Sequence, residues 1–266
     1  MKPRIETLNR GYFSQIIMKK SFPLILMFTV AVLISGTAKA DCVVLLHGLA
    51  RTSKSMNIIG EAFQHQGFKV VNIDYPSRSE PVEKLAPKAI DAGIKACNTD
   101  SNEKIHFVTH SMGGILVRYY LAEHKIINLG RVVMLAPPNN GSEVIDNLKN
   151  MPGFKMVNGP AGLQLGTQPE SIPSRLGAVD YPVGIIAGSQ TVNPILSQYL
   201  PNPDDGKVSV QSTKVKGMTD FILLPVSHPF IMRDEEAIRQ AIAFIETGSF
   251  IHNPPEKPAA PKSKNE

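Results

Sequence analysis

Ser111 is the residue whose setting in the sequence points most directly to chemistry. It lies in the run Ile105 to Tyr120, IHFVTHSMGGILVRYY, where an apolar strand leads through a serine into a helix that carries two glycines. Such a junction projects the serine hydroxyl above a sheet and places its backbone at a helix N-terminus. The pattern therefore predicts that Ser111 is a nucleophile.

A serine hydroxyl is a weak nucleophile, so it needs a base to accept its proton and a carboxylate to orient that base. Of the histidines that follow Ser111, His124 falls at the end of the same helix and His252 in the C-terminal tail. His228 comes immediately after a strand predicted at Phe221–Leu224, at the same carboxyl edge of the sheet as Ser111. We therefore expect His228 to be the base.

The acid is expected between nucleophile and base, because strand-turn-helix sites of this kind run Ser, Asp or Glu, then His along the chain. Asp204 and Asp205 follow a strand predicted at Val183–Ala187 and so lie at the correct edge, whereas Asp180 and Asp220 would lie at the opposite one. Asp205 is preferred, because the glycine after it permits a tight turn that points its carboxylate inward. Asp204 stays open as the alternative.

A tetrahedral intermediate needs preorganised hydrogen-bond donors for its oxyanion. The backbone N–H groups of Leu49, in the loop after the first strand, and of Met112, directly after the nucleophile, are the candidates. Gly48 permits the close backbone turn that this loop requires. His47 and His110 are interpreted as structural residues of the two turns.

Short apolar runs alternate with longer amphipathic segments from residue 41 onward, which favours an α/β fold with a mostly parallel six-stranded sheet and helices on both faces. The predicted strands are Val43–Leu46, Lys69–Ile73, Ile105–Val108, Arg131–Leu135, Val183–Ala187 and Phe221–Leu224. The predicted helices are Ser55–His65, Val82–Ala96, Met112–Glu123 and Asp234–Ile245.

Residues 141–181 interrupt this alternation with a long connection that is rich in Gly and Pro and has no obvious regular structure. Connections of this length are often lids or binding loops, and the alternative is a surface excursion packed on the domain. Past residue 250 a tail rich in Pro and Lys, 251–266, is expected to be disordered. A single domain over 41–250 with a lid-like insertion at 141–181 is therefore predicted.

The first forty residues have the layout of a secretory signal peptide, with its start expected at Met18. A basic start is followed by an apolar run from Phe22 to Ile34 and by a small-x-small cleavage site at Ala38-Lys39-Ala40. A stable transmembrane anchor needs about 20 apolar residues, so this run predicts cleavage instead. We expect export to the periplasm or the medium.

The net charge of +5 belongs to this leader. Residues 1–40 carry 6 of the 28 Lys and Arg and 1 of the 23 Asp and Glu, so the rest of the chain holds 22 of each sign. A neutral mature chain without a basic stripe argues against a nucleic-acid partner. No ligand spacing for a catalytic metal and no dinucleotide fingerprint is present, so we expect chemistry that needs no cofactor.

The two cysteines, Cys42 and Cys97, remain after cleavage in a chain bound for an oxidising compartment. An even pair in that setting more often forms a disulfide than two free thiols. A Cys42–Cys97 bond is predicted, which would tie the first strand to the end of the helix before the Ser111 strand.

Four motifs in this order, HGL after the first strand, THSMGG, DDGKV and SHPFIM, resemble the α/β-hydrolase superfamily, in particular bacterial secreted lipases and esterases. The resemblance covers roughly residues 41–248 and implies a compact version of that fold. One departure is Thr109, which replaces the first glycine of the G-x-S-x-G motif. Small residues, threonine included, occur at this position in the superfamily.

The residues and the resemblance together predict a secreted serine carboxylester hydrolase, an esterase or lipase that acts through Ser111, His228 and Asp205 on an apolar acyl ester. The expected partner is a small-molecule or lipid ester, with peripheral contact with lipid as a further option. A thioesterase, an amidase or an acyltransferase would use the same three residues. A binding protein on a hydrolase scaffold is the alternative from another class.

Overall fold

The computed structural model describes residues 41–98 and 102–252. The predicted signal peptide and nearly all of the predicted tail lie outside the described residues. Within the described ranges, no helix has both the length and the hydropathy that are needed to cross a bilayer.

Six strands form one sheet, in the order β2-β1-β3-β4-β5-β6, and every neighbouring pair is parallel. The strands are β1 Cys42–Leu46, β2 Lys69–Ile73, β3 Ile105–His110, β4 Leu129–Leu135, β5 Val183–Gly188 and β6 Asp220–Leu224. Because the pairing is parallel, the carboxyl ends of all six strands meet at one edge. The predicted fold class, a parallel six-stranded α/β sheet, is confirmed.

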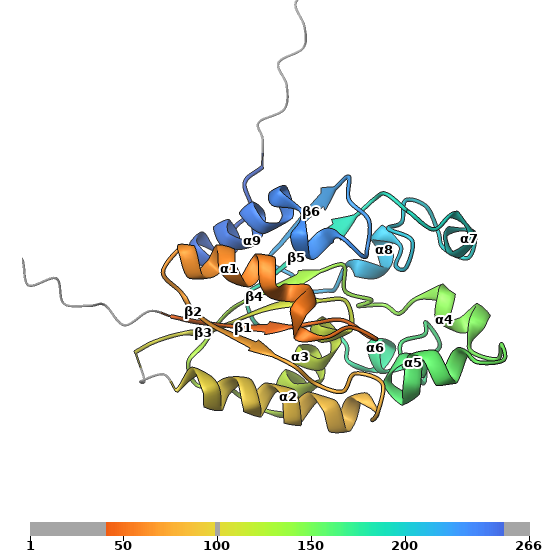
Figure 1. Ribbon diagram of the computed structural model, residues 1–266, viewed down its shortest axis with the longest axis horizontal. Coiled ribbons are helices and arrows are strands. Elements are labelled where there is room, and N and C mark those ends of the chain that lie inside the picture. Colours follow the sequence, from red (N-terminus) through yellow and green to blue (C-terminus); the bar gives the residue numbers. More distant parts are fainter. Residues whose placement is uncertain (1–40, 99–101, 253–266) are drawn as a thin grey trace, which may run out of the picture. The chain divides into compact units, whose positions relative to one another are not determined.

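Helices cover both faces of the sheet, α1 and α9 on one and α2 and α3 on the other (Figure 1). These four helices are α1 Asn57–His65, α2 Val82–Cys97, α3 Met112–Glu123 and α9 Glu235–Thr247. The shorter helices of the described chain are η1 Ser53–Met56, α4 Glu143–Leu148, α5 Phe154–Leu163, α6 Ile172–Arg175, α7 Pro194–Ser197, α8 Val210–Thr213 and η2 Ile231–Arg233.

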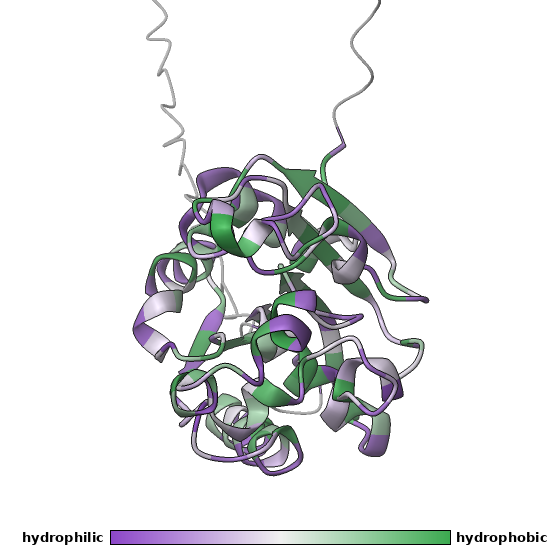
Figure 2. Cartoon of the chain, turned by 90° about the vertical axis from the view of Figure 1, so that its right-hand side faces the viewer, coloured by the Kyte–Doolittle hydropathy of each residue, from purple (hydrophilic) through white to green (hydrophobic). Residues whose placement is uncertain are grey.

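The alternation of side chains along the strands divides the core into two layers. Val44 and Leu46 of β1 face the layer of α2 and α3, whereas Val43 and Leu45 face the layer of α1 and α9. Both sets are fully buried, so β1 is apolar at every position. In Figure 2 the strands are mainly hydrophobic, whereas the helices mix hydrophobic and hydrophilic residues.

The prediction that residues 141–181 lack regular structure is wrong. Helices α4, α5 and α6 lie in this segment, and α5 is kinked at Gly159, which has φ 65°. The helices span only 6, 10 and 4 residues, too short for an apolar repeat to be recognised in the sequence. These helices are too short to be stable by intrinsic propensity. They are stabilised by the burial of Val144, Ala161 and Ile172 against the rest of the domain.

The predicted disulfide is confirmed. Cys42, at the start of β1, is bonded to Cys97, the last residue of α2, with their Cα atoms 5.8 Å apart. Both residues are completely buried. The bond therefore fastens the C-terminal end of α2 to the start of β1.

Removing this bond is expected to destabilise the fold without changing it. The bond closes a loop with a sequence separation of 55 residues. Loop-closure entropy predicts a loss of roughly 2–4 kcal/mol for Cys42→Ser/Cys97→Ser. Urea denaturation with and without dithiothreitol measures this loss, and the double variant, as the control, should not respond to the reductant. Two alkylatable thiols in the native unreduced protein would contradict the bond.

Candidate active site

Ser111 sits at the sharp turn between β3 and α3, in a conformation that non-glycine residues rarely adopt. Its φ and ψ are 54° and −120°, and its N–H donates to the carbonyl oxygen of Leu135 on β4 at 2.8 Å. A strained backbone of this kind persists only where the surrounding structure holds it, and it is common at functional sites. The predicted strand-serine-helix junction is therefore present.

Close packing beneath the turn explains the residues on either side of the serine. A Cβ atom on Gly113 would lie 2.7 Å from the carbonyl oxygen of Leu46, so only glycine lets α3 approach β1 this closely. Thr109, which departs from the usual glycine, is fully buried, and its hydroxyl donates to the carbonyl oxygen of Val133 at 3.3 Å. The turn accommodates the threonine.

His228 connects Ser111 to Asp205. Its Nε2 lies 3.0 Å from Ser111 Oγ, and its Nδ1 lies 2.8 Å from Asp205 Oδ2. The backbone N–H of His228 also donates to the carbonyl oxygen of Asp205 at 3.0 Å, which joins the loops after β5 and β6. With Nδ1 donating to the carboxylate, Nε2 is left to accept the proton of the Ser111 hydroxyl.

Asp205, and not Asp204, is the acid that faces His228. The second oxygen of Asp205, Oδ1, accepts the backbone N–H groups of Lys207 at 2.9 Å and Val208 at 2.8 Å, which fix the carboxylate. Asp204 is turned away, where its oxygens accept the Ser197 hydroxyl at 2.6 Å and the backbone N–H that follows Asp205 at 2.7 Å. The tight turn expected after Asp205 is present, with φ 91° at its glycine.

The loop after β1 lies against the Ser111 turn. A Cβ atom on Gly48 would come within 3.2 Å of Ser111 Cβ and within 2.7 Å of His110 Nδ1. Leu49 follows on this loop and Met112 is the first residue of α3. Neither backbone N–H donates to another group within residues 41–98 and 102–252. Two free donors therefore flank the serine.

His110 has a positioning role that the sequence did not indicate beyond its place beside Ser111. Its Nε2 donates to the backbone carbonyl of His228 at 3.1 Å, so it connects the serine turn to the His228 loop. Burial lowers the pKa of His110 well below its ordinary value, and His228 and Arg51 lower it further. The ring is therefore neutral, with its proton on Nε2.

His47, in contrast, belongs to the support of the loop after β1. It is completely buried and stacks on Tyr75 with ring centroids 4.1 Å apart. The backbone N–H of Tyr75 donates to His47 Nε2 at 3.3 Å, and the Tyr75 hydroxyl donates to the His47 carbonyl oxygen. His47 does not line the cavity above Ser111.

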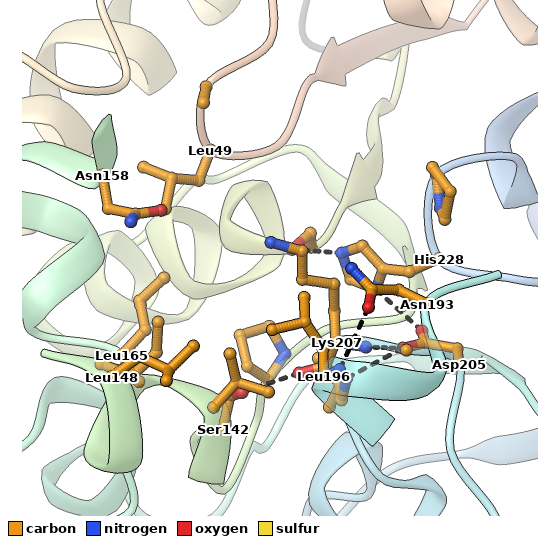
Figure 3. Close-up of a pocket in the computed structure, with 18 of the residues that line it drawn as sticks. Leu49, Ser142, Leu148, Asn158, Leu165, Asn193, Leu196, Asp205, Lys207 and His228 are labelled. Atoms are coloured by element: carbon orange, nitrogen blue, oxygen red, sulfur yellow. Dashed lines mark hydrogen bonds and ion pairs between the residues drawn. The ribbon is translucent and has the colours of Figure 1, made fainter. Parts of the chain in front are cut away.

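A cavity of about 610 Å³ opens above Ser111 and His228 (Figure 3). Its walls are mainly apolar, and α4 and α5 of the 141–181 insertion supply one of them. The apolar side chains on that wall are Val144, Ile145, Leu148, Phe154 and Val157, with Leu165 shortly after α5. Such a volume with a few convergent polar groups is typical of a small-molecule site. No group of His, Cys, Asp and Glu suited to a metal ion occurs in the described part of the chain.

A family profile described as alpha/beta hydrolase fold matches residues 41–156, which contain the Ser111 turn. The chain has the α/β-hydrolase fold. Among curated proteins, none matches it in sequence.

Solved structures of similar fold include bacterial and metagenomic enzymes. The mature lipase BlEst2 of Bacillus licheniformis has a TM-score of 0.60 at 16% identity, over 80% of this chain and 94% of that one. The metagenomic carboxyl esterase MGS0156 has a TM-score of 0.59 at 18% identity, over 79% of this chain and 76% of the esterase chain. A structure reported with the metagenome-derived lipolytic enzymes LipS and LipT has a TM-score of 0.54 at 17% identity, over 78% of this chain and 94% of that chain. These similarities establish the α/β-hydrolase fold of this protein.

The buried histidines predict how stability depends on pH. Burial lowers the pKa values of His47, His106 and His110 in the folded protein. The unfolded chain binds these protons near pH 6.5, so it holds more protons than the folded state just below that pH. The free energy of unfolding should therefore fall as pH drops below about 6.5, by up to about 1.4 kcal/mol per pH unit for each histidine.

The contribution of His110 can be isolated with His110→Gln, whose amide can still donate to the His228 carbonyl but does not titrate. Urea denaturation between pH 5 and pH 8 should give a shallower slope for this variant than for the wild type. Equal slopes would show that His110 is not held neutral by the fold.

Proposed function

We propose that this α/β-hydrolase-fold protein is a serine hydrolase of carboxylic esters, an esterase or lipase. The observation that carries the proposal is the hydrogen-bonded series from Asp205 through His228 to Ser111, which is arranged on a strained serine turn. This arrangement supplies a nucleophile, a base and an orienting carboxylate within hydrogen-bond distance.

In the proposed reaction, Ser111 Oγ attacks the carbonyl carbon of the ester while His228 Nε2 takes up the hydroxyl proton. Asp205 holds the ring and stabilises the imidazolium that forms. The N–H groups of Leu49 and Met112 donate to the oxyanion of the tetrahedral intermediate. Collapse of the intermediate breaks the ester C–O bond, and His228 gives its proton to the leaving alcohol. Water, activated by His228, then hydrolyses the acyl-enzyme and restores Ser111.

The apolar wall of the cavity supports an apolar group on the substrate. Removing aliphatic surface from water contributes about 25 cal/mol per Å² buried, so an alkyl chain on this wall would be bound favourably. The names of similarly folded structures, a lipase and a carboxyl esterase, agree with this class of substrate. The disulfide supports export to an oxidising compartment.

Ser111→Ala, His228→Ala and Asp205→Asn should each lower kcat for p-nitrophenyl esters. The expected losses are about 10⁴-fold or more, because removing one member of such a series disables the others. Hydrolysis assays with short to long acyl chains measure this, beside labelling of Ser111 by a fluorophosphonate. A wild-type protein that neither hydrolyses the esters nor takes up the probe would instead be a binding protein on this scaffold.

Asp204→Asn is the matched control for Asp205→Asn. It makes the same chemical change one residue away, on a carboxylate that faces Ser197 and not His228. We expect kcat to fall less than about 10-fold in this variant, or less than about 1.4 kcal/mol in activation free energy, because the Asp204 carboxylate contacts neither His228 nor Ser111. Equal losses in the two variants would contradict the role assigned to Asp205.

Leu148→Trp should shift the preferred acyl chain to a shorter length. Leu148 lines the cavity on α4, near Leu165 in Figure 3, so a larger side chain there would shorten the space along the apolar wall. The ratio of kcat/KM for octanoate and butyrate p-nitrophenyl esters should fall by about 10-fold or more, the scale of one or two methylenes in an apolar pocket. An unchanged ratio would show that the acyl chain lies elsewhere.

A further inference from the structure

Two cationic side chains line the cavity above Ser111. Arg51 follows the loop after β1, and Lys207 lies two residues after Asp205. Among the described residues, neither forms an ion pair with a carboxylate. The mechanism proposed above does not use either side chain.

The Arg51 guanidinium is half-buried and has most of its hydrogen-bonding capacity unused. Its one hydrogen bond within the described chain runs from Nη2 to the carbonyl oxygen of Pro229, at 3.3 Å. A guanidinium has five N–H donors in a planar fork that matches the oxygens of a phosphate or carboxylate. Burial and then the nearby Arg233 lower the pKa of Arg51, so its surroundings do not compensate its charge.

Lys207 is held by its backbone while its ammonium group stays free. Its N–H donates to Asp205 Oδ1 at 2.9 Å, and its carbonyl oxygen accepts the Ser142 hydroxyl at 2.7 Å. Its side chain extends into the cavity in Figure 3, and its Nζ makes no hydrogen bond within the described residues. Lys207 is exposed as a residue, but the protein around its ammonium group lowers its pKa by desolvation, a shift that Asp205 opposes and Arg51 adds to.

No acidic group in the cavity is available to neutralise these two charges. Asp205 is the only acid among the described residues that line it, and both of its oxygens are occupied by His228 and by backbone N–H groups. Removing a cation from water without a partner is unfavourable, and the Arg51 side chain is half-buried. An anion bound between Arg51 and Lys207 would offset that cost.

We propose that Arg51 and Lys207 form a site for an anionic group, a phosphate or a carboxylate, on the ester that Ser111 attacks. The apolar part of the same molecule would lie on the wall formed by α4 and α5. The substrate class is therefore an amphiphilic ester with one negatively charged end. This inference rests on the proposed esterase function for the identity of the reaction, but the anion site can be tested without turnover.

The test measures binding to the full chain carrying Ser111→Ala, by isothermal titration calorimetry at low salt. The probes are hexyl phosphate, hexanoate and the neutral 1-hexanol. At least one anion should bind about 10-fold more tightly than 1-hexanol, which corresponds to about 1.4 kcal/mol. A preference for hexyl phosphate would indicate a phosphorylated ester, and a preference for hexanoate an ester with a free carboxylate.

Adding Arg51→Gln and Lys207→Gln should reduce that preference to less than about 3-fold, and raising the salt concentration should weaken it in the parent. Lys54→Gln with Lys216→Gln removes two charges at exposed positions outside the cavity and should retain the preference. Equal binding of all three probes, or a preference that survives Arg51→Gln/Lys207→Gln, would overturn the site.

Failure of the esterase proposal would be recognised separately. A protein that binds the anionic probe through Arg51 and Lys207, yet neither hydrolyses nitrophenyl esters nor reacts with a fluorophosphonate, would keep the anion site and lose the hydrolase. A protein that hydrolyses these esters but binds the three probes equally would keep the hydrolase and lose the anion site.

Discussion

The close contact between three backbone segments at the Ser111 turn is the constraint on which the site depends. The serine has a positive φ, its N–H is bonded to β4, and α3 lies so close to β1 that only Gly113 fits. A strained turn cannot hold itself in place. The strands β1, β3 and β4 do so here, and every residue of β1 and β3 is buried.

The parallel sheet also determines where the other groups can come from. Each crossover returns the chain to the same carboxyl edge, so the loops after β1, β5 and β6 meet beside Ser111. The loops of Asp205 and His228 are then joined to one another by a backbone hydrogen bond, and His110 joins the second of them to the serine turn. The geometry of the side chains follows from these backbone connections, and a change in one loop is expected to affect the others.

The same edge collects groups that the proposed hydrolytic mechanism does not use. Arg51 lies two residues after Leu49, and Lys207 lies two residues after Asp205, so both cations are placed by the loops that also carry proposed catalytic groups. Residues of the 141–181 segment supply an apolar wall of the same cavity. One cavity therefore combines the Ser111 hydroxyl, an apolar surface and two cationic side chains that form no ion pair within the described residues.

Local patterns in the sequence were sufficient to predict those elements that depend on residues close together in the chain. The strand before Ser111, the bounds of α3 and the six apolar strands follow from side-chain periodicity and turn residues, and the cysteine pair followed from its number and setting. The glycine after Asp205 favoured this residue over Asp204 but left both open, and tertiary structure decided that Asp205 faces His228. Tertiary structure also determined the helices within residues 141–181, the hydrogen bond from His110 to the His228 carbonyl, and the presence of Arg51 and Lys207 on one cavity. These features depend on packing between segments far apart in the chain, which no local pattern records.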